Sequence, residues 1–256
     1  MSSAKILELG FKGFLTIIPL ILAVNFCSGQ EITSEKLIEF KFGFQAPLAD
    51  METRFGGSNV IGFGLQNANL HSTFLYGIDG FFIFGNTVKE DVLQNLRSFD
   101  GNIVGIDGHP ADVNLKERGF YFGLNAGKIF KITKEKNNLT GIRTQIGVGL
   151  LQHKIRVQEN SNTIVALNKE YLNEFDRLSN GPSIHLAAGF QYDNPKNNFH
   201  FNIMGNLIGA TTKSRRDYDH VTGGYIDTKR TDIQAGLSLS YIVSISRSEK
   251  ADNIYY

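Results

Sequence analysis

The sequence predicts an all-β fold: an eight-stranded antiparallel transmembrane β-barrel with short periplasmic turns and long extracellular loops. Three observations predict it. Eight segments alternate between apolar and small or polar residues, the gaps between them are long and short in turn, and the last segment is amphipathic. The composition agrees, because the 256 residues include 27 Gly and 20 Phe but only 5 Pro, which favours β-structure.

The segment 1–29 has the features of a cleavable signal peptide. Two lysines, Lys5 and Lys12, precede an uncharged apolar run over 14–26, and small residues follow this run. This order of basic, apolar and small residues is typical of exported proteins. We therefore expect removal of 1–29 and a single barrel domain over 30–256.

Two other interpretations of the leader stay open. A membrane anchor needs about 20 apolar residues, and the run over 14–26 is shorter. A lipoprotein would be acylated at Cys27, although the large Phe26 stands where that processing normally requires a small residue. We therefore prefer the cleaved signal peptide.

Charge and cysteine content exclude several classes of function. Lys and Arg total 26 against 25 Asp and Glu, so no basic surplus exists to hold a nucleic-acid backbone. The single cysteine, Cys27, belongs to the leader. Without the leader the chain has no disulfide, no thiolate metal site and no cysteine nucleophile. We expect no nucleic-acid partner and no cofactor.

In each predicted strand, apolar residues alternate with small or polar residues. This pattern is expected of a strand, because its successive side chains point to opposite faces. In chain order the strands are 38–46, 59–67, 73–84, 119–132, 139–157, 182–192, 199–211 and 232–243. An even number of antiparallel strands permits closure into a barrel.

One face of each predicted strand carries large apolar side chains. In chain order these include Phe40, Phe42 and Phe44; Ile61, Phe63 and Leu65; Phe74, Tyr76 and Phe82; Phe120, Phe122 and Leu124; Ile142, Ile146 and Val148; Ile184, Leu186 and Phe190; Phe199, Phe201 and Ile203; Leu237, Leu239 and Tyr241. The opposite faces are mainly glycine, serine, amide and charged residues, although Phe81 and Ile83 interrupt the third. Such faces could not fill a soluble core. We therefore place the apolar faces against lipid, where barrel closure satisfies the backbone hydrogen bonds.

The gaps between the strands alternate in length. Long gaps cover 47–58, 85–118, 158–181 and 212–231, and short, turn-rich gaps cover 68–72, 133–138 and 193–198. Outer-membrane barrels show this alternation, with short turns in the periplasm and long loops outside. Since the first and last gaps are both long, both ends of the barrel domain should lie on the periplasmic side.

The last strand carries a polar residue at Gln234, a glycine two positions later and alternating hydrophobic residues up to Tyr241. This pattern resembles the signal that delivers outer-membrane proteins to the barrel-assembly machinery. We therefore expect that machinery to be a partner during biogenesis.

Two of the long gaps contain segments with helical spacing. In 88–96 and 168–178 apolar residues recur every three to four positions, which predicts short amphipathic helices over the barrel mouth; a docking surface is the alternative. The stretch from Asp107 to Asp112 is acidic, but it lacks the alternate oxygen ligands and closing glutamate of a calcium loop. We interpret that stretch as a plain turn.

Catalytic and metal sites have weak support in the sequence. None of the 6 histidines belongs to a pair at metal-ligand spacing. His220 lies near Asp217 and Asp219, but no nucleophile can be identified. Basic residues from Lys213 to Arg216, with Lys229 and Arg230, could contact lipopolysaccharide phosphates. Pairing with Asp217, Asp219 and Asp227 across the same hairpin is the simpler interpretation. We expect no enzyme, no catalytic residue and no metal.

Charged and amide side chains on the inward faces predict a polar network in the lumen. In a ring of eight strands the first and fifth lie opposite each other, so Glu39 and Arg143 can meet across the narrow lumen. Lys41 and Asp79 form a second expected pair, with Gln145 beside Arg143. The alternative is that water and neighbouring amides solvate each charge separately.

The mature start at Gln30, the eight-strand layout and the segments 119–124 and 175–181 resemble the small outer-membrane barrels of Bacteroidota, including the PorT-like group. The resemblance spans most of the mature chain. It implies a place in the cell outer membrane and a link to type IX secretion or another envelope assembly. No functional residue can be carried over from it.

The expected function is that of a structural or accessory component of an envelope or secretion complex. The expected partners are outer-membrane lipid, lipopolysaccharide and an envelope-complex protein. A membrane-embedded lipid-modifying enzyme and a narrow channel are the alternatives. The channel is disfavoured because side chains normally fill the lumen of an eight-stranded barrel.

Overall fold

The structure, a computed structural model, describes residues 34–135, 138–160, 163–168, 171–194, 199–216, 218–219, 223–225 and 229–245. These residues belong to one compact unit, Ser34–Tyr256. The expected signal peptide over 1–29, with Cys27, lies outside the described residues, as do Asp217 and His220.

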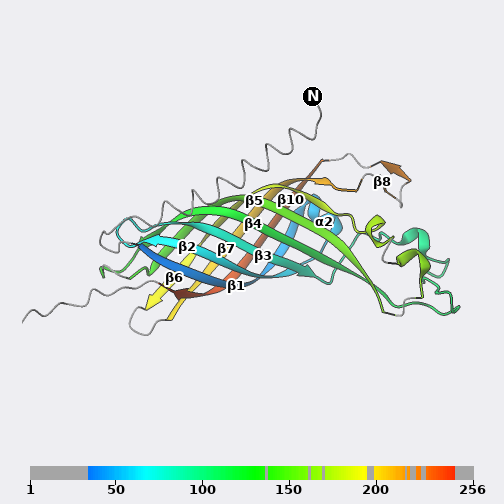
Figure 1. Cartoon of the computed structure of the whole chain (residues 1–256), viewed down its shortest axis with the longest axis horizontal. Coiled ribbons are helices and arrows are strands. Elements are labelled where there is room, and N and C mark those ends of the chain that lie inside the picture. Colours follow the sequence, from blue (N-terminus) through cyan, green and yellow to red (C-terminus); the bar gives the residue numbers. More distant parts are fainter. Residues whose placement is uncertain are drawn as a thin grey trace, which may run out of the picture. The chain divides into compact units, whose positions relative to one another are not determined.

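Eight long strands form a closed barrel (Figure 1). They are β1 (Ser34–Ala49), β2 (Ser58–Asn69), β3 (Phe74–Gly85), β4 (Val113–Lys131), β5 (Gly141–Glu159), β6 (Ser179–Asn194), β7 (Phe199–Ser214) and β10 (Lys229–Ser244). Each pairs in antiparallel with its neighbours, and β1 closes the ring by pairing with β10. The expected fold class and all eight expected strands are confirmed. The two-residue strands β8 (Tyr218–Asp219) and β9 (Gly224–Tyr225) form a separate small sheet.

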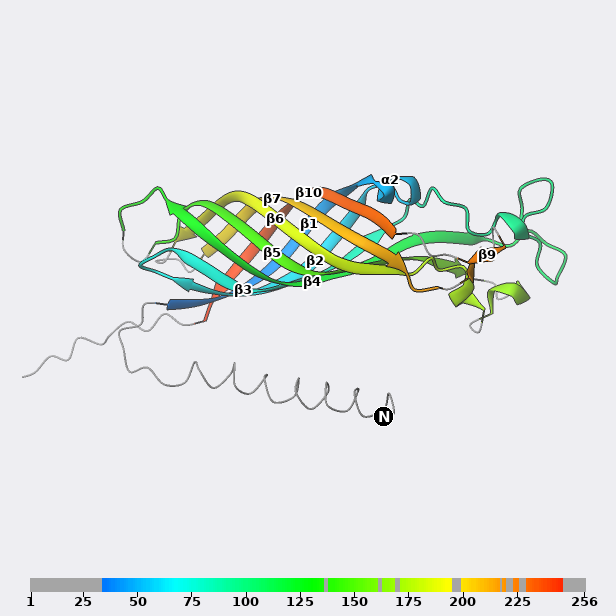
Figure 2. The same cartoon turned by 90° about the horizontal axis from the view of Figure 1, so that it is seen from above.

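The connections at the two ends of the barrel differ in length. At the end that we call the turn end, 70–73 joins β2 to β3 and 132–140 joins β4 to β5. At the opposite end, the loop end, 86–112 and 160–178 are much longer. The strands β4 and β5, of 19 residues each, extend toward these loops (Figure 2). This is the expected alternation, with the turn end on the periplasmic side.

The outer surface of the barrel is apolar, as the alternation predicts. Phe42 is 58% exposed and Leu237 is 67% exposed, whereas the inward Glu39 is 1% exposed. Together the outward side chains make an apolar belt. It comprises Phe40, Phe42, Phe44, Ile61, Phe63, Leu65, Phe82, Phe120, Phe122, Leu124, Ile142, Ile146, Val148, Leu150, Ile184, Leu186, Phe190, Ile203, Leu207, Leu237, Leu239 and Tyr241.

The two amphipathic helices expected over the barrel mouth are absent from the described residues, so that prediction was wrong. In their described parts, the two long loops hold three-residue 3₁₀ turns at Gln94–Leu96, Val165–Leu167 and Leu172–Glu174. A five-residue α-helix, α2 (Asp50–Arg54), lies between β1 and β2. No described helix is long and apolar enough to cross a membrane.

Local contacts override the helical spacing in the loop 86–112. Val88 forms a β-bridge with Phe55, and the Asp91 carboxylate accepts the Leu93 N–H at 3.1 Å. A side chain that bonds to the nearby backbone in this way competes with a helix. The apolar residues of the loop are therefore buried by packing against other connections and not along one helical face.

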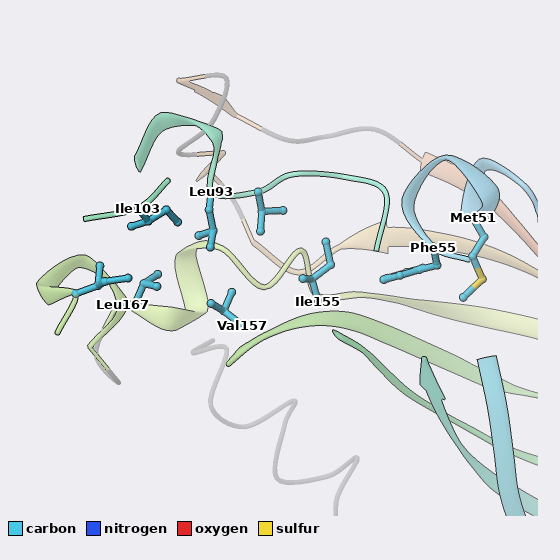
Figure 3. Close-up of a cluster of buried hydrophobic side chains, with 9 residues drawn as sticks. Met51, Phe55, Leu93, Ile103, Ile155, Val157 and Leu167 are labelled. Atoms are coloured by element: carbon cyan, nitrogen blue, oxygen red, sulfur yellow. The ribbon is translucent and has the colours of Figure 1, made fainter. Parts of the chain in front are cut away.

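The connections at the loop end share a hydrophobic core, which we call the loop cluster (Figure 3). Its buried members are Met51, Phe55, Val92, Leu93, Ile103, Ile155, Val157, Ile164 and Leu167. They come from α2 and the residue after it, from both long loops and from the extension of β5. Burial of one such side chain contributes about 1.5–3 kcal/mol, so the loops are packed together over the barrel mouth.

Candidate functional site in the barrel lumen

Arg143 is the centre of a polar layer in the part of the lumen near the turn end. It points inward from β5 and is fully buried. Its guanidinium donates to Glu39 Oε1 at 2.5 Å, to Gln191 Oε1 at 3.0 Å and to Gln145 Oε1 at 3.1 Å. Because β1 and β5 lie four strands apart in either direction around the ring, the ion pair between Arg143 and Glu39 crosses the lumen.

Asp79 holds a second ion pair in the same layer. Its Oδ1 accepts from Lys41 Nζ at 2.7 Å and from Gln66 Nε2 at 3.1 Å. Its Oδ2 accepts from Gln145 Nε2 at 3.2 Å. Gln145 therefore links the two ion pairs, since its oxygen accepts from Arg143 and its nitrogen donates to Asp79.

Gly64 leaves the space in which the second ion pair lies. It is paired with Asp79 between β2 and β3. A Cβ atom at this position would lie 2.6 Å from Asp79 Oδ1 and 3.4 Å from Lys41 Cε. Because hydrogen bonds hold the carboxylate in place, it could not move aside without losing them. A glycine is therefore needed at position 64 for close packing.

All five residues of the expected lumen polar network lie in this layer: Glu39, Lys41, Asp79, Arg143 and Gln145. Both expected ion pairs are present, and Lys41 Nζ also lies 3.5 Å from Glu39 Oε2. The side chains of Glu39, Asp79 and Arg143 are each 1% exposed. Two cations facing two carboxylates leave the buried layer without net charge, which offsets part of the cost of desolvation.

Two apolar layers enclose the polar layer. On the side of the turn end the lumen holds Leu37, Ala68, Leu75, Ile129, Leu139 and Ile242. On the side of the loop end it holds Val60, Phe81, Ile83, Tyr121, Leu151, Ile208 and Ala210. The rings of Phe81 and Tyr121 stack with their centroids 4.8 Å apart. Phe81 and Ile83, which interrupt the alternation of the third strand, therefore fill the lumen.

A second polar layer, which the sequence analysis missed, lies nearer the loop end. His153 Nε2 is 2.8 Å from Asp232 Oδ2, and the Thr212 hydroxyl donates to the same oxygen. Phe55 packs edge-on against the His153 ring with 5.5 Å between centroids. Alternation predicts that His153 and Asp232 face inward, but it does not give their relative heights along the barrel.

Glu90 joins the long loops to the barrel mouth. Its Oε2 lies 2.6 Å from Arg54 Nε and its Oε1 lies 2.9 Å from Arg177 Nε. Arg54 also donates to the Ser179 hydroxyl at the start of β6. Since both arginines are largely buried, these contacts fix α2 and the two long loops over the lumen.

The stretch from Asp107 to Asp112 forms a turn, as we interpret it from the sequence. The Asp107 carboxylate accepts the His109 N–H at 3.1 Å, and Gly108 has a φ of +75°. Among the described residues, no group of three or more His, Cys, Asp or Glu could hold a metal ion.

Two basic residues at the ends of the last loop contact other connections, whereas the expected partners Asp217 and Asp227 lie outside the described residues. Arg216 donates to the two oxygens of Asp176 at 2.8 and 2.7 Å. Arg230 donates to the backbone carbonyl of Asp50. Asp176 and Asp50 belong to other connections at the loop end, so Arg216 and Arg230 tie the last loop to them. Arg230 Nε also lies 3.7 Å from Asp232 Oδ1 on its own strand.

The barrel has the architecture of an outer-membrane protein. A bilayer offers no hydrogen-bond partners to the backbone, and a closed ring of strands supplies them all. The apolar belt faces outward and the polar side chains face inward, as in barrels that cross an outer membrane. The chain is therefore an eight-stranded β-barrel of the outer membrane.

No family model matches the chain, and no curated protein matches it. Among solved structures it is similar to Neisserial surface protein A, with 10% identity over 82% of this chain and 97% of that chain and a TM-score of 0.42. It is also similar to the outer membrane protein OprG from Pseudomonas aeruginosa, with 10% identity over 81% and 95% and a TM-score of 0.39. The outer membrane protein AlkL gives 12% identity over 88% and 97% and a TM-score of 0.39. No functional conclusion follows from likenesses this weak.

Proposed function

We propose that the chain is a non-conducting outer-membrane barrel that serves as a structural or accessory component of an envelope assembly. The observation that carries this proposal is the filled lumen, in which apolar and polar layers alternate. An ion crossing the barrel would have to displace buried side chains such as Phe81 and break the pair between Arg143 and Glu39. These costs disfavour the narrow channel.

The proposal includes the kind of assembly, which is type IX secretion or a related envelope complex. The resemblance of 119–124 and 175–181 to PorT-like barrels of Bacteroidota supports type IX secretion or a related envelope complex. The loop end supplies a contact surface, because Phe99 is fully exposed and Ile106 is 77% exposed on the long loop 86–112. Exposed large apolar side chains on an ordered loop are typical of protein interfaces.

Co-purification from native outer membranes tests the proposal. The tagged full-length chain, extracted in mild detergent, should retain a protein partner in fixed stoichiometry. The double variant Phe99→Ser with Ile106→Ser should lose that partner and still fold. Tyr225→Ser is the matched control, because it removes another exposed aromatic side chain at the β8–β9 hairpin. Recovery of the wild-type barrel without any partner protein would contradict the proposal.

A lipid-modifying enzyme is the second candidate function, and the pair of His153 and Asp232 beside the Thr212 hydroxyl favours it. Many hydrolases use a carboxylate that orients a histidine, but there the hydroxyl donates to the histidine, whereas the Thr212 hydroxyl donates to the carboxylate. In addition, His153 is fully buried against Phe55, so a substrate could reach it only if the loop cluster opened. Release of fatty acid from lipopolysaccharide by the purified barrel, lost in Asp232→Asn, would support this candidate. If the wild-type barrel releases no fatty acid, this candidate function is excluded.

A further inference from the structure

Four basic side chains stand together on the outer face of β4 and β5. Lys116 lies directly opposite Arg156, and Arg118 lies directly opposite Lys154. Like charges directly opposite each other destabilise an antiparallel pair of strands. Strand pairing therefore gives no reason for both cross-strand pairs to be basic. We call these four residues the basic quartet.

The carboxylates that the structure describes neutralise the quartet only in small part. Lys154 Nζ lies 3.7 Å from Asp176 Oδ2, but Arg216 already donates two hydrogen bonds to that carboxylate. Among the described residues, no carboxylate lies within ion-pair distance of the other three members. Arg118 donates instead to backbone carbonyls, among them that of Glu117 at 2.5 Å. The quartet therefore presents excess positive charge on the outside of the barrel.

The quartet begins where the apolar belt ends. On β4, Arg118 is the next residue on the outward face after Phe120 and Phe122, which belong to the belt. On β5, Gln152 separates Lys154 from the belt residue Leu150 on the same face. Outward side chains on one strand are spaced by about 7 Å. The four cations therefore lie just beyond the hydrocarbon edge at the loop end, at the level of lipid headgroups.

We propose that the basic quartet binds the phosphate groups of an anionic lipid of the outer leaflet, whose acyl chains lie along Phe120, Phe122 and Leu150. Charge complementarity supports the headgroup contact, because Arg and Lys form charge-assisted hydrogen bonds to phosphate oxygens. Continuity with the belt supports a lipid as the source of the phosphate. The two cross-strand pairs provide two adjacent positions for phosphate groups. This binding site requires only the membrane location and not the accessory role proposed above.

Native mass spectrometry of the full-length barrel, titrated with diphosphoryl lipid A in a zwitterionic detergent, tests this proposal. The wild type should bind the lipid. A variant with all four quartet residues changed to glutamine should bind at least about tenfold more weakly, since each basic residue near a membrane surface contributes to binding. Lys128→Gln is the matched control, because it removes an outward-facing lysine of β4 near the turn end. Its binding should match that of the wild type.

Further variants keep the test independent of folding. Heat-modifiable migration on gels reports whether each barrel is folded. The charge-retaining pair Arg118→Lys with Arg156→Lys should bind within a few-fold of the wild type, and the pair Lys116→Gln with Arg156→Gln should show an intermediate loss. Equal binding by the wild type and a folded neutral variant would overturn the proposal. Displacement of the lipid by inorganic phosphate at equal concentration would also overturn it, because the site would then bind a free anion.

Discussion

The polar layer of the lumen and the loop cluster are both buried, but different contacts fill them. Arg143, Glu39, Lys41 and Asp79 fill the lumen layer through directional ion pairs, whereas the loop cluster is entirely apolar. The strands fix the height and direction of each lumenal side chain, so opposite charges can be matched across the barrel. The loops have no such register, and non-directional hydrophobic burial suits them better.

The largest effect is expected in the lumen. Arg143→Ala leaves Glu39 buried without its main partner, and removal of one member of a buried ion pair costs about 3–5 kcal/mol. The free energy of unfolding, measured with urea in lipid vesicles, should fall accordingly. Addition of Glu39→Gln should restore part of the loss.

The control for this variant is Arg97→Ala. Arg97 pairs with Asp91 at 2.5 Å, but on the exposed surface of a loop, where such a pair contributes less than about 1 kcal/mol. A double-mutant cycle without coupling between positions 39 and 143 would mean that each charge is solvated separately.

A smaller and more local effect is expected in the loop cluster. Leu93→Ala should destabilise the cluster by about 2–5 kcal/mol, because a fully buried leucine leaves a cavity. Hydrogen exchange should accelerate in 86–112, in 160–178 and in the extension of β5 that carries Ile155 and Val157, and it should stay unchanged in the rest of the barrel strands. Val104→Ala, at a side chain that is 51% exposed in the same loop, should change neither region. Equal acceleration in the barrel strands would show that the two regions unfold as one unit.

The same contrast explains how much could be predicted from the sequence. Period-two alternation predicts the strands, their outward faces and the partners Glu39 and Arg143, because the strand number determines which strands are opposite. It does not give the heights of His153 and Asp232, since the stagger of the strands follows from the closed hydrogen-bond register. Helical spacing in 88–96 was misleading, because tertiary packing decides the conformation of a loop.

Gly64 and Gly209 differ in the space around them, so they separate the effect of close packing from that of an open surface. Gly64→Ala should destabilise the barrel by about 1–3 kcal/mol, because the new Cβ overlaps the Asp79 carboxylate and overpacking has this cost. Gly209→Ala is the matched control on β7, where an added Cβ meets nothing within 4 Å, and it should change stability by less than about 0.5 kcal/mol. Thermal unfolding of the two variants and the wild type measures both changes in stability. Equal losses would show that strand glycines matter for reasons other than space.

The smallest effect concerns pH at the surface of the loops. Burial alone would raise the pKa of Asp91, but hydrogen bonds from Arg97 and the Leu93 N–H hold it below its usual value. A depressed folded pKa contributes stability above the unfolded pKa of about 3.9, and this stability is lost as the pH falls through the folded pKa. The protection factors of amides in 86–112, which correct hydrogen exchange for its intrinsic pH dependence, should therefore fall below about pH 4 in the wild type. The fall should be smaller in Asp91→Asn, and an identical fall would remove Asp91 as its cause.

Single-channel recording in planar bilayers tests most directly whether the lumen is closed. We predict no conductance steps from the wild-type barrel, because apolar and polar layers fill it. The triple variant Phe81→Ala, Tyr121→Ala and Arg143→Ala removes the stacked rings and the central cation, and it should produce steps if it inserts. Regular, ion-selective steps from the purified wild-type barrel would contradict the closed lumen.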